Sequence, residues 1–461
     1  MSEQQGSYLD WFRYRTVPKI PGLFESTFWD QVVLQASVSE PAVLHASLAL
    51  AAAHRDFRFE PFRSHQVADY DESSFILQHY NKAIVHARGL LANGDRPSIR
   101  LSLILCLLFT CLEYMRGHYG VGNAHLSGGL ELMRCTKNSL GEKHDYIDVC
   151  VSEEFARLNV QSLSFGQRAW AQTGMLVTKD RTVMSSRFSS MAEARNSLLQ
   201  LLNKCCGLYA QSYLHTTSDS RSSLHVLKIA LESDLAGWLT IFESSQVAVE
   251  TQLGAAGPVA YRMLLLYHTY ATLALAPCLD PTGEMAFDGY LNTFVSILDQ
   301  TRELRQLVFS GIFTGTAHEL REDAAPFVLD MAGIAPLYYT AVKCRDRHVR
   351  MQAVEMLEDT KKREGVWDSD VAACVAREII RIEEASWPCR PTSGWQSNLN
   401  DESSCGSTGF REHRLCDARV TLPNEPTGDI VLTCSWEKSA YRPPIKRTYN
   451  QRRRMWSGVE S

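Results

Sequence analysis

Apolar residues recur at helical spacing along most of this chain, and this periodicity restricts the folds open to it. Between residues 224 and 242, seven large apolar side chains are separated by steps of 3, 4, 4, 3, 1 and 3, which places them on one helix face. These residues are Leu224, Leu227, Leu231, Leu235, Trp238, Leu239 and Phe242. The sequence therefore predicts a long amphipathic helix here, preceded by a loop over residues 215–223.

Similar patterns predict helices elsewhere, and there is no convincing alternation of strands and helices before residue 386. We expect Ser39 to cap a helix that Pro41 begins, Gly120 and Gly122 to form a tight turn, and Pro336 to kink a buried helix. Residues 136–195 show no clear period. The predicted helices cover 28–36, 41–54, 74–91, 98–116, 124–133, 257–276, 287–298, 351–357 and 371–382. The expected fold class is all-α, a multi-helix bundle of packed helix hairpins.

The composition is that of a globular protein without an excess of basic charge. Of the 461 residues, 45% are hydrophobic, and the formal net charge is −5. Proteins that bind polyanions over their whole surface usually carry a basic excess, so that class is excluded. The longest apolar run, Leu101 to Leu112, is shorter than the roughly 18 residues that a membrane span requires. No membrane partner is therefore expected.

Composition changes after residue 382, and this change predicts the domain organisation. Residues 1–385 form the helical domain, and 386–412, rich in Pro, Ser and Gly, form a flexible linker. Residues 413–440 hold two short strand-like runs that predict a small β-hairpin. Residues 441–461 are strongly basic and are expected to be a disordered tail.

The usual signatures of catalysis and metal binding are absent from the sequence. It has no phosphate-binding loop, no nucleophile turn and no Cys-x-x-Cys pair among its thirteen cysteines, which are expected to be reduced. His79 and His86 are seven residues apart, as are His118 and His125, and that spacing is too long for one metal ion. We therefore expect no enzyme, no cofactor and no metal site.

Two groups of charged residues near the end of the helical region have competing interpretations. Arg345, Arg347 and Arg350 follow Cys344 closely and would suit a phosphate group, but pairing with carboxylates between packed helices explains them equally and is favoured. Asp346 is expected to cap the helix that follows. The pair Glu383-Glu384 is expected on a solvated helix surface.

The basic tail holds the candidate site residues of the sequence. Its spacing of basic residues resembles a bipartite nuclear import signal, and contact with phosphate groups is the second interpretation. A solvated tail without a function is a third, since short basic runs are common. The candidate residues are Lys446, Arg447, Arg452, Arg453 and Arg454.

Three blocks of sequence, in order, resemble the regulatory domain of fungal zinc binuclear cluster (Zn2Cys6) transcription factors. The first runs from Phe24 to His54 and contains Phe28-Trp29 and Glu40-Pro41-Ala42-Val43. The second holds Tyr80-Asn81-Lys82-Ala83-Ile84 and His125-Leu126-Ser127-Gly128-Gly129, and the third runs from Gly333 to Asp368. Together the blocks span residues 8 to 385.

This resemblance implies an all-α regulatory domain and a transcriptional regulator in the nucleus, of the kind that controls metabolic or secondary-metabolite gene clusters. It also implies protein partners in the transcription machinery, a homo- or heterodimer, and a small-molecule effector. The family's N-terminal six-cysteine zinc module, which reads DNA, is not recognisable here, because the first cysteine is Cys106. We therefore expect no specific DNA contact by this chain alone.

Two explanations for the missing module remain open, namely its loss and an upstream exon before Met1. The alternative function is a ligand-sensing or scaffold protein of the same fold that does not bind promoters directly.

Overall fold

Helices make up most of the chain, in agreement with the predicted all-α class. The structure, a computed structural model, describes residues 2–59, 70–137, 145–165, 186–212, 218–313, 327–385, 414–436 and 443–458. The predicted linker over 386–412 lies outside these residues, and the predicted division of the chain into domains stays a prediction.

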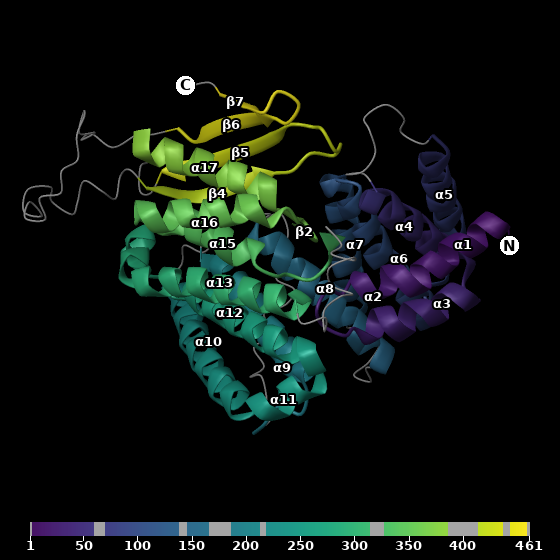
Figure 1. The fold of residues 1–461 in the computed structure, drawn as a ribbon, viewed down its shortest axis with the longest axis horizontal. Coiled ribbons are helices and arrows are strands. Elements are labelled where there is room, and N and C mark those ends of the chain that lie inside the picture. Colours follow the sequence, from purple (N-terminus) through teal and green to yellow (C-terminus); the bar gives the residue numbers. More distant parts are fainter. Residues whose placement is uncertain are drawn as a thin grey trace, which may run out of the picture.

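The first half of the chain forms a helical body on the N-terminal side of the molecule, coloured purple to blue in Figure 1. Helix pairs build it: α4 packs on α5 and α6, and α6 packs on α7. Its elements are α1 (Glu3–Trp11), the π-helix η1 (Phe12–Thr16), α2 (Val17–Lys19), the π-helix η2 (Phe28–Val33), α3 (Leu34–Ser39), α4 (Pro41–Phe59), α5 (Tyr70–Asn93), α6 (Arg96–Met115) and α7 (Tyr119–Lys137).

The second half of the chain forms the other side of the molecule, and α8 joins the two halves because it contacts α6 and α7 on one side and α9 on the other (Figure 1). The helices of this half are α8 (Tyr146–Ser164), α9 (Met191–Ser212), α10 (Ser218–Ser244), α11 (Gln246–Gln252), η5 (Gly254–Ala256), α12 (Gly257–Leu275), η6 (Gly283–Tyr290), α13 (Leu291–Phe313), α15 (Ile334–Lys343), α16 (Arg347–Thr360) and α17 (Ser369–Ala385).

The apolar stripe predicted between residues 224 and 242 is the buried face of α10, as expected. Trp238 is fully buried, its ring stacks on Phe242 at 4.5 Å, and its indole Nε1 donates to the Ala194 carbonyl of α9 at 3.0 Å. The helix begins at Ser218, so the predicted loop over 215–223 is wrong for residues 218–223.

Three local predictions are also wrong. The Ser39 hydroxyl donates to the Gln35 carbonyl of the preceding helix at 3.3 Å, so it ends α3 instead of capping α4. Pro336 lies in the first turn of α15, where proline fits a helix without bending it. Gly120 and Gly122 lie within α7, and the turn before that helix is made by Gly117, whose φ is +78°.

These glycines allow close packing between distant segments. A Cβ on Gly122 would press into the Tyr114 ring of α6, and one on Gly120 would overlap Asn424 in a loop near the C-terminus. A Cβ on Gly117 would lie 3.3 Å from the Pro426 Cα in the same loop. The C-terminal region is therefore packed directly against the N-terminal helical body.

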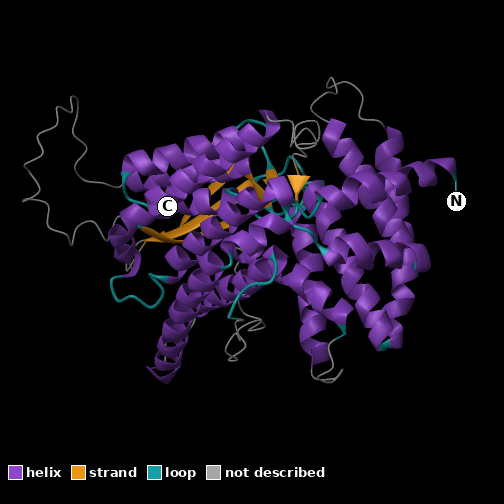
Figure 2. Cartoon of the chain, turned by 60° about the horizontal axis from the view of Figure 1, so that its bottom comes forward, coloured by secondary structure: helices purple, strands orange, loops and turns teal. Residues whose placement is uncertain are grey.

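A four-stranded antiparallel sheet follows α17 in the chain, with the order β4-β5-β6-β7. Figures 1 and 2 place this C-terminal sheet in the half of the molecule away from the N-terminus, beside α17 in Figure 1. Its strands are β4 (Leu415–Thr421), β5 (Ile430–Trp436), β6 (Ile445–Asn450) and β7 (Met455–Ser457). A smaller sheet joins β1 (Phe327–Val328), β2 (Arg363–Glu364) and β3 (Trp367–Asp368).

The C-terminal sheet confirms one sequence prediction and corrects another. Strands β4 and β5 pair as the predicted hairpin. The expectation of a disordered tail from residue 441 is wrong, because β6 pairs with β5 and β7 pairs with β6. Tyr449 and Trp456 face each other across the β6–β7 pair with ring centroids 5.1 Å apart, and such aromatic pairs stabilise a hairpin.

Helix α6 is the one described helix that is long and apolar enough to cross a membrane by composition. Most of it, 78% of its most apolar stretch, is buried inside the fold. Asp95 caps this helix by accepting from the Ser98 amide at 2.9 Å, and α4, α5 and α7 cover it. These contacts make α6 the central core helix of the N-terminal body.

Candidate functional site

The predicted basic residues lie together on the β6–β7 hairpin, which we call the basic hairpin. Lys446 and Arg447 lie on β6, and Arg452, Arg453 and Arg454 occupy the turn that leads to β7. Four of these side chains are exposed to solvent, the exception being Arg447. The folded hairpin therefore presents four exposed basic groups, three in its turn and Lys446 near the start of β6.

Arg447 is held against α17 and differs from the other four. Its side chain is 13% exposed, and its Nε lies 3.6 Å from the Glu378 Oε1. The alternation along β6 explains this, because Ile445, Arg447 and Tyr449 turn the same face of the strand toward α17. Cys374 on α17 lies beside Tyr449 and helps to form this contact. Arg447 thus anchors the sheet.

The arginines after Cys344 pair with carboxylates, as the sequence favoured. Both oxygens of Glu383 on α17 accept from the Arg345 Nη1 at 2.8 Å, and the Arg350 Nη2 lies 2.8 Å from the second of them. Glu383 is only 4% exposed, so its predicted place on a solvated surface is wrong. Asp346 caps α16 as expected, through the Val349 amide at 2.9 Å.

This ion-pair cluster also attaches the C-terminal sheet to the helices. The first amide of β4, that of Leu415, donates to the Glu383 Oε1 at 3.0 Å. Arg414, just before β4, donates to the Glu284 carbonyl at 3.0 Å and to the Asp288 carboxylate at 2.6 Å. The sheet is therefore fixed where α15, α16, α17 and η6 meet.

The charge states within this cluster follow from its contacts. Burial works against ionisation of Glu383, but Arg345, Arg350 and the Leu415 amide outweigh burial, so the pKa of Glu383 lies below its ordinary value. Lys343 on α15 lies 2.7 Å from the Glu284 Oε1, and this carboxylate raises the pKa of Lys343 despite burial. Both shifts favour the charged forms of Glu383 and Lys343.

The histidines that share helical spacing have separate partners within the fold. The Nδ1 atoms of His45 and His79 are 3.0 Å apart, and burial lowers the pKa of His79 to about 4. His125 pairs with the Tyr80 hydroxyl at 3.0 Å, and His118 with Glu113 at 2.6 Å. Among the described residues, no group of three histidine, cysteine or acidic side chains is arranged to hold a metal ion.

The fold is largely helical, and buried charged groups tie its helices to the C-terminal sheet. Residues 7–168 match the family model described as the fungal specific transcription factor domain. The chain is also 22% identical, over 83% of its own length and 74% of the relative's, to the aspercryptin biosynthesis cluster-specific transcription regulator atnN of Emericella nidulans. No solved structure matches the chain.

These matches confirm the resemblance stated from the sequence. The family model over residues 7–168 and the relative in Emericella nidulans both describe transcription regulators.

Proposed function

We propose that this chain regulates transcription of a secondary-metabolite gene cluster from within the nucleus. The match of residues 7–168 to the fungal specific transcription factor domain carries the proposal. The relative in Emericella nidulans, described as specific to a biosynthetic cluster, supports the narrower assignment to secondary metabolism. The helical body supplies the regulatory surface, and no catalytic step is involved.

We propose further that a protein partner, a related regulator or a second copy, provides sequence-specific contact with DNA. The basic hairpin then has one of the two roles that the sequence suggested, nuclear import or contact with phosphate groups. Its four exposed cationic side chains suit both roles, because each role requires accessible charge. Arg447 takes no part in either, since Glu378 and α17 hold it.

The test is a transcript comparison in the organism that encodes the chain. Deletion of the gene should change the transcripts of one biosynthetic gene cluster, and re-expression should restore them. Unchanged cluster transcripts in the deletion strain would refute the proposal and would favour a scaffold or ligand-sensing protein without a role at promoters.

A fluorescent fusion tests the role of the basic hairpin in the same strains. Alanine at its four exposed basic positions should abolish nuclear accumulation if the hairpin is an import signal, and should leave accumulation intact if it only contacts phosphate. The matched control removes four exposed cationic side chains elsewhere and should leave location and transcripts unchanged. These control positions are Arg134, Arg302, Arg347 and Lys361.

A further inference from the structure

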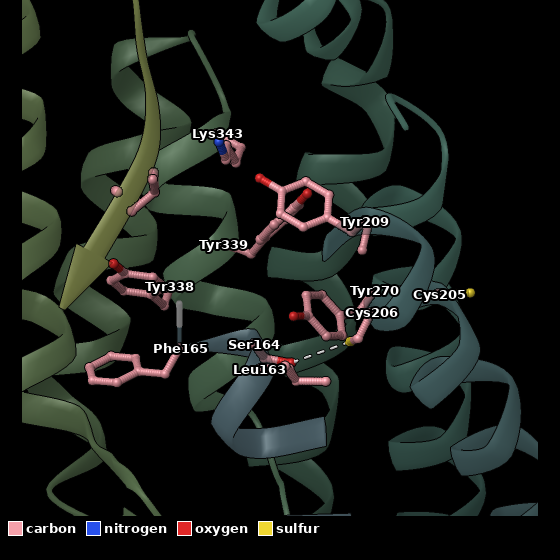
Figure 3. A pocket seen from close by; sticks show the side chains of 13 residues that line it. Leu163, Ser164, Phe165, Cys205, Cys206, Tyr209, Tyr270, Tyr338, Tyr339 and Lys343 are labelled. Atoms are coloured by element: carbon pink, nitrogen blue, oxygen red, sulfur yellow. Dashed lines mark hydrogen bonds between the residues drawn. The ribbon is translucent and has the colours of Figure 1, made fainter. Parts of the chain in front are cut away.

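A small cavity lies where the helices of the second half meet the C-terminal sheet. Its volume is about 90 Å³, and Figure 3 shows the side chains around it. Five segments line it: the end of α8, then α9, α12, α15 and β4. Ala418 in this lining belongs to β4, the strand that the ion-pair cluster fixes to the helices.

The walls of the cavity are mainly aromatic and aliphatic. Tyr209, Tyr270 and Tyr339 gather on one side and Phe165 and Tyr338 on the other (Figure 3). Tyr270 and Tyr339 meet edge to face with ring centroids 5.5 Å apart. Such walls suit an apolar ligand, because small-molecule sites are mostly apolar with a few polar groups that fix orientation.

Among the hydrogen-bond donors that line the cavity, the Tyr339 hydroxyl and Lys343 are the two that bear on ligand binding. The Tyr339 hydroxyl oxygen is buried and has no hydrogen-bond partner among the residues that the structure describes, although a buried hydroxyl normally has one. Lys343 is the single charged residue in the lining. A ligand that accepts hydrogen bonds would satisfy the Tyr339 hydroxyl.

The charges around Lys343 favour a negatively charged ligand. Lys343 and Arg345 share one carboxylate, that of Glu284, at 2.7 and 3.3 Å. Among the described residues, the connected cluster has four cationic side chains and three carboxylates, so it carries an excess of one positive charge. The cationic side chains are Lys343, Arg345, Arg350 and Arg414, and the carboxylates are Glu284, Asp288 and Glu383. A buried excess charge is costly, and an anion would neutralise it.

A second cavity, of about 170 Å³, lies directly beyond this wall. Tyr209 lines both cavities, and the Lys343–Glu284 pair joins one lining to the other.

We propose that this cavity binds a small apolar carboxylate, with its hydrocarbon part among the tyrosines and its carboxylate accepting from Lys343 and the Tyr339 hydroxyl. Two sets of contacts connect this site to the C-terminal sheet. Ala418 of β4 lines the cavity, and the shared Glu284 links Lys343 through Arg345 to Glu383. The site would thus act as an effector site of the regulator. Its binding test does not depend on the transcriptional role.

The experiment is isothermal titration of the full chain with benzoate and hexanoate, each compared with its neutral amide, benzamide or hexanamide. Each carboxylate should bind at least about tenfold more tightly than its amide, since one ion pair or charged hydrogen bond in a buried site contributes about that factor or more. Lys343→Met should remove this preference while leaving weak binding of the amides. Lys361→Met, the same change at an exposed lysine, should alter nothing.

Filling the cavity provides a second test. Ala418→Leu and Ala274→Leu each add bulk to the lining from a different element and should abolish binding of all four probes. Unfolding curves close to that of the wild type would show that these variants fold, and one folded variant is enough for the test. Equal affinity for acid and amide, or no binding of any probe at 5 mM, would overturn the proposal and leave the cavity a packing void.

Discussion

Removal of the Glu383 carboxylate should strongly destabilise the fold, because this group neutralises buried arginines and binds the first strand of the C-terminal sheet. In Glu383→Ala, Arg345 keeps Glu284 as a partner, but among the described residues Arg350 keeps the Ala341 carbonyl at 2.8 Å and no carboxylate. The Arg350 side chain is 6% exposed and would become a buried charge without a counter-ion. Breaking a buried ion pair in this way costs about 3–5 kcal/mol.

The assay is urea unfolding followed by circular dichroism, with Glu383→Gln and Glu384→Ala as companions. Glu383→Gln should lower the free energy of unfolding by less than Glu383→Ala does, because the amide oxygen of glutamine still accepts from the Leu415 N–H. Glu384 is next in the chain, but it pairs with Arg347 at the surface, where both side chains are at least 37% exposed. Its removal should cost at most about 1 kcal/mol. An equal decrease in the free energy of unfolding for Glu383→Ala and Glu384→Ala would show that the buried ion pairs do not stabilise the fold more than the surface pair does.

The same reasoning predicts a pH dependence with a definite sign. The pKa of Glu383 lies below its ordinary value of 4.5, so the folded state binds the proton less readily than the unfolded state does. The stability advantage of the wild type over Glu383→Gln should be fully present above about pH 4.5 and should shrink as the pH falls further. An advantage that grew on acidification would contradict the assigned charge state.

Three further predictions concern packing and the basic hairpin. Trp238→Ala should destabilise the fold by about 3–5 kcal/mol in the same urea assay, whereas the exposed Val226→Ala on the same helix should change it by less than about 0.5 kcal/mol. Gly129→Ala should lower the free energy of unfolding by about 1–3 kcal/mol, because the new methyl would overlap the buried Phe155 ring. An unchanged free energy of unfolding would show that α7 and α8 can move apart without loss of stability. DNA binding should be weak and independent of sequence, with a log–log salt slope of about −3.6 from four phosphate contacts. A salt titration on two unrelated duplexes checks this, and a thousandfold preference for one duplex would reveal base readout that the structure does not explain.

Helices with a continuous apolar stripe could be predicted from the sequence, and the interrupted ones could not. α10 and α17 each bury a single apolar face, which is the pattern that the sequence shows. α8 was missed because it buries polar residues where a stripe would have apolar ones. Glu154 pairs with Arg157 within α8 at 2.6 Å. Asn159 pairs with Asn203 of α9 at 3.1 Å, a contact that exists only after the two helices pack.

In the C-terminal region, a run of basic residues and a pair of aromatic residues gave conflicting structural predictions. Three arginines in a row suggested a disordered tail, yet they occupy a turn between strands that Tyr449 and Trp456 hold together. The aromatic residues on either side of the turn were the signal for a hairpin. The pairing of charged groups could not be predicted from the sequence either. Glu383 and Arg345 are 38 residues apart and become neighbours only when α15, α16 and α17 pack together.

The cavity could not be predicted from the sequence at all. Its lining residues come from five elements between Leu163 and Ala418, and each of them has an ordinary core or helix position in its own segment. Their assembly leaves the Tyr339 hydroxyl without a hydrogen-bond partner in the described part of the chain.

The most direct test of the central claim, that this chain regulates transcription, is rapid depletion of the protein followed by sequencing of nascent transcripts. A degradation tag on the chain in its own organism would remove it within minutes, before secondary effects accumulate. The proposed function predicts that nascent transcripts of one biosynthetic gene cluster change first and return when an untagged copy is supplied. Nascent transcription that stays unchanged across the genome after complete depletion would contradict it.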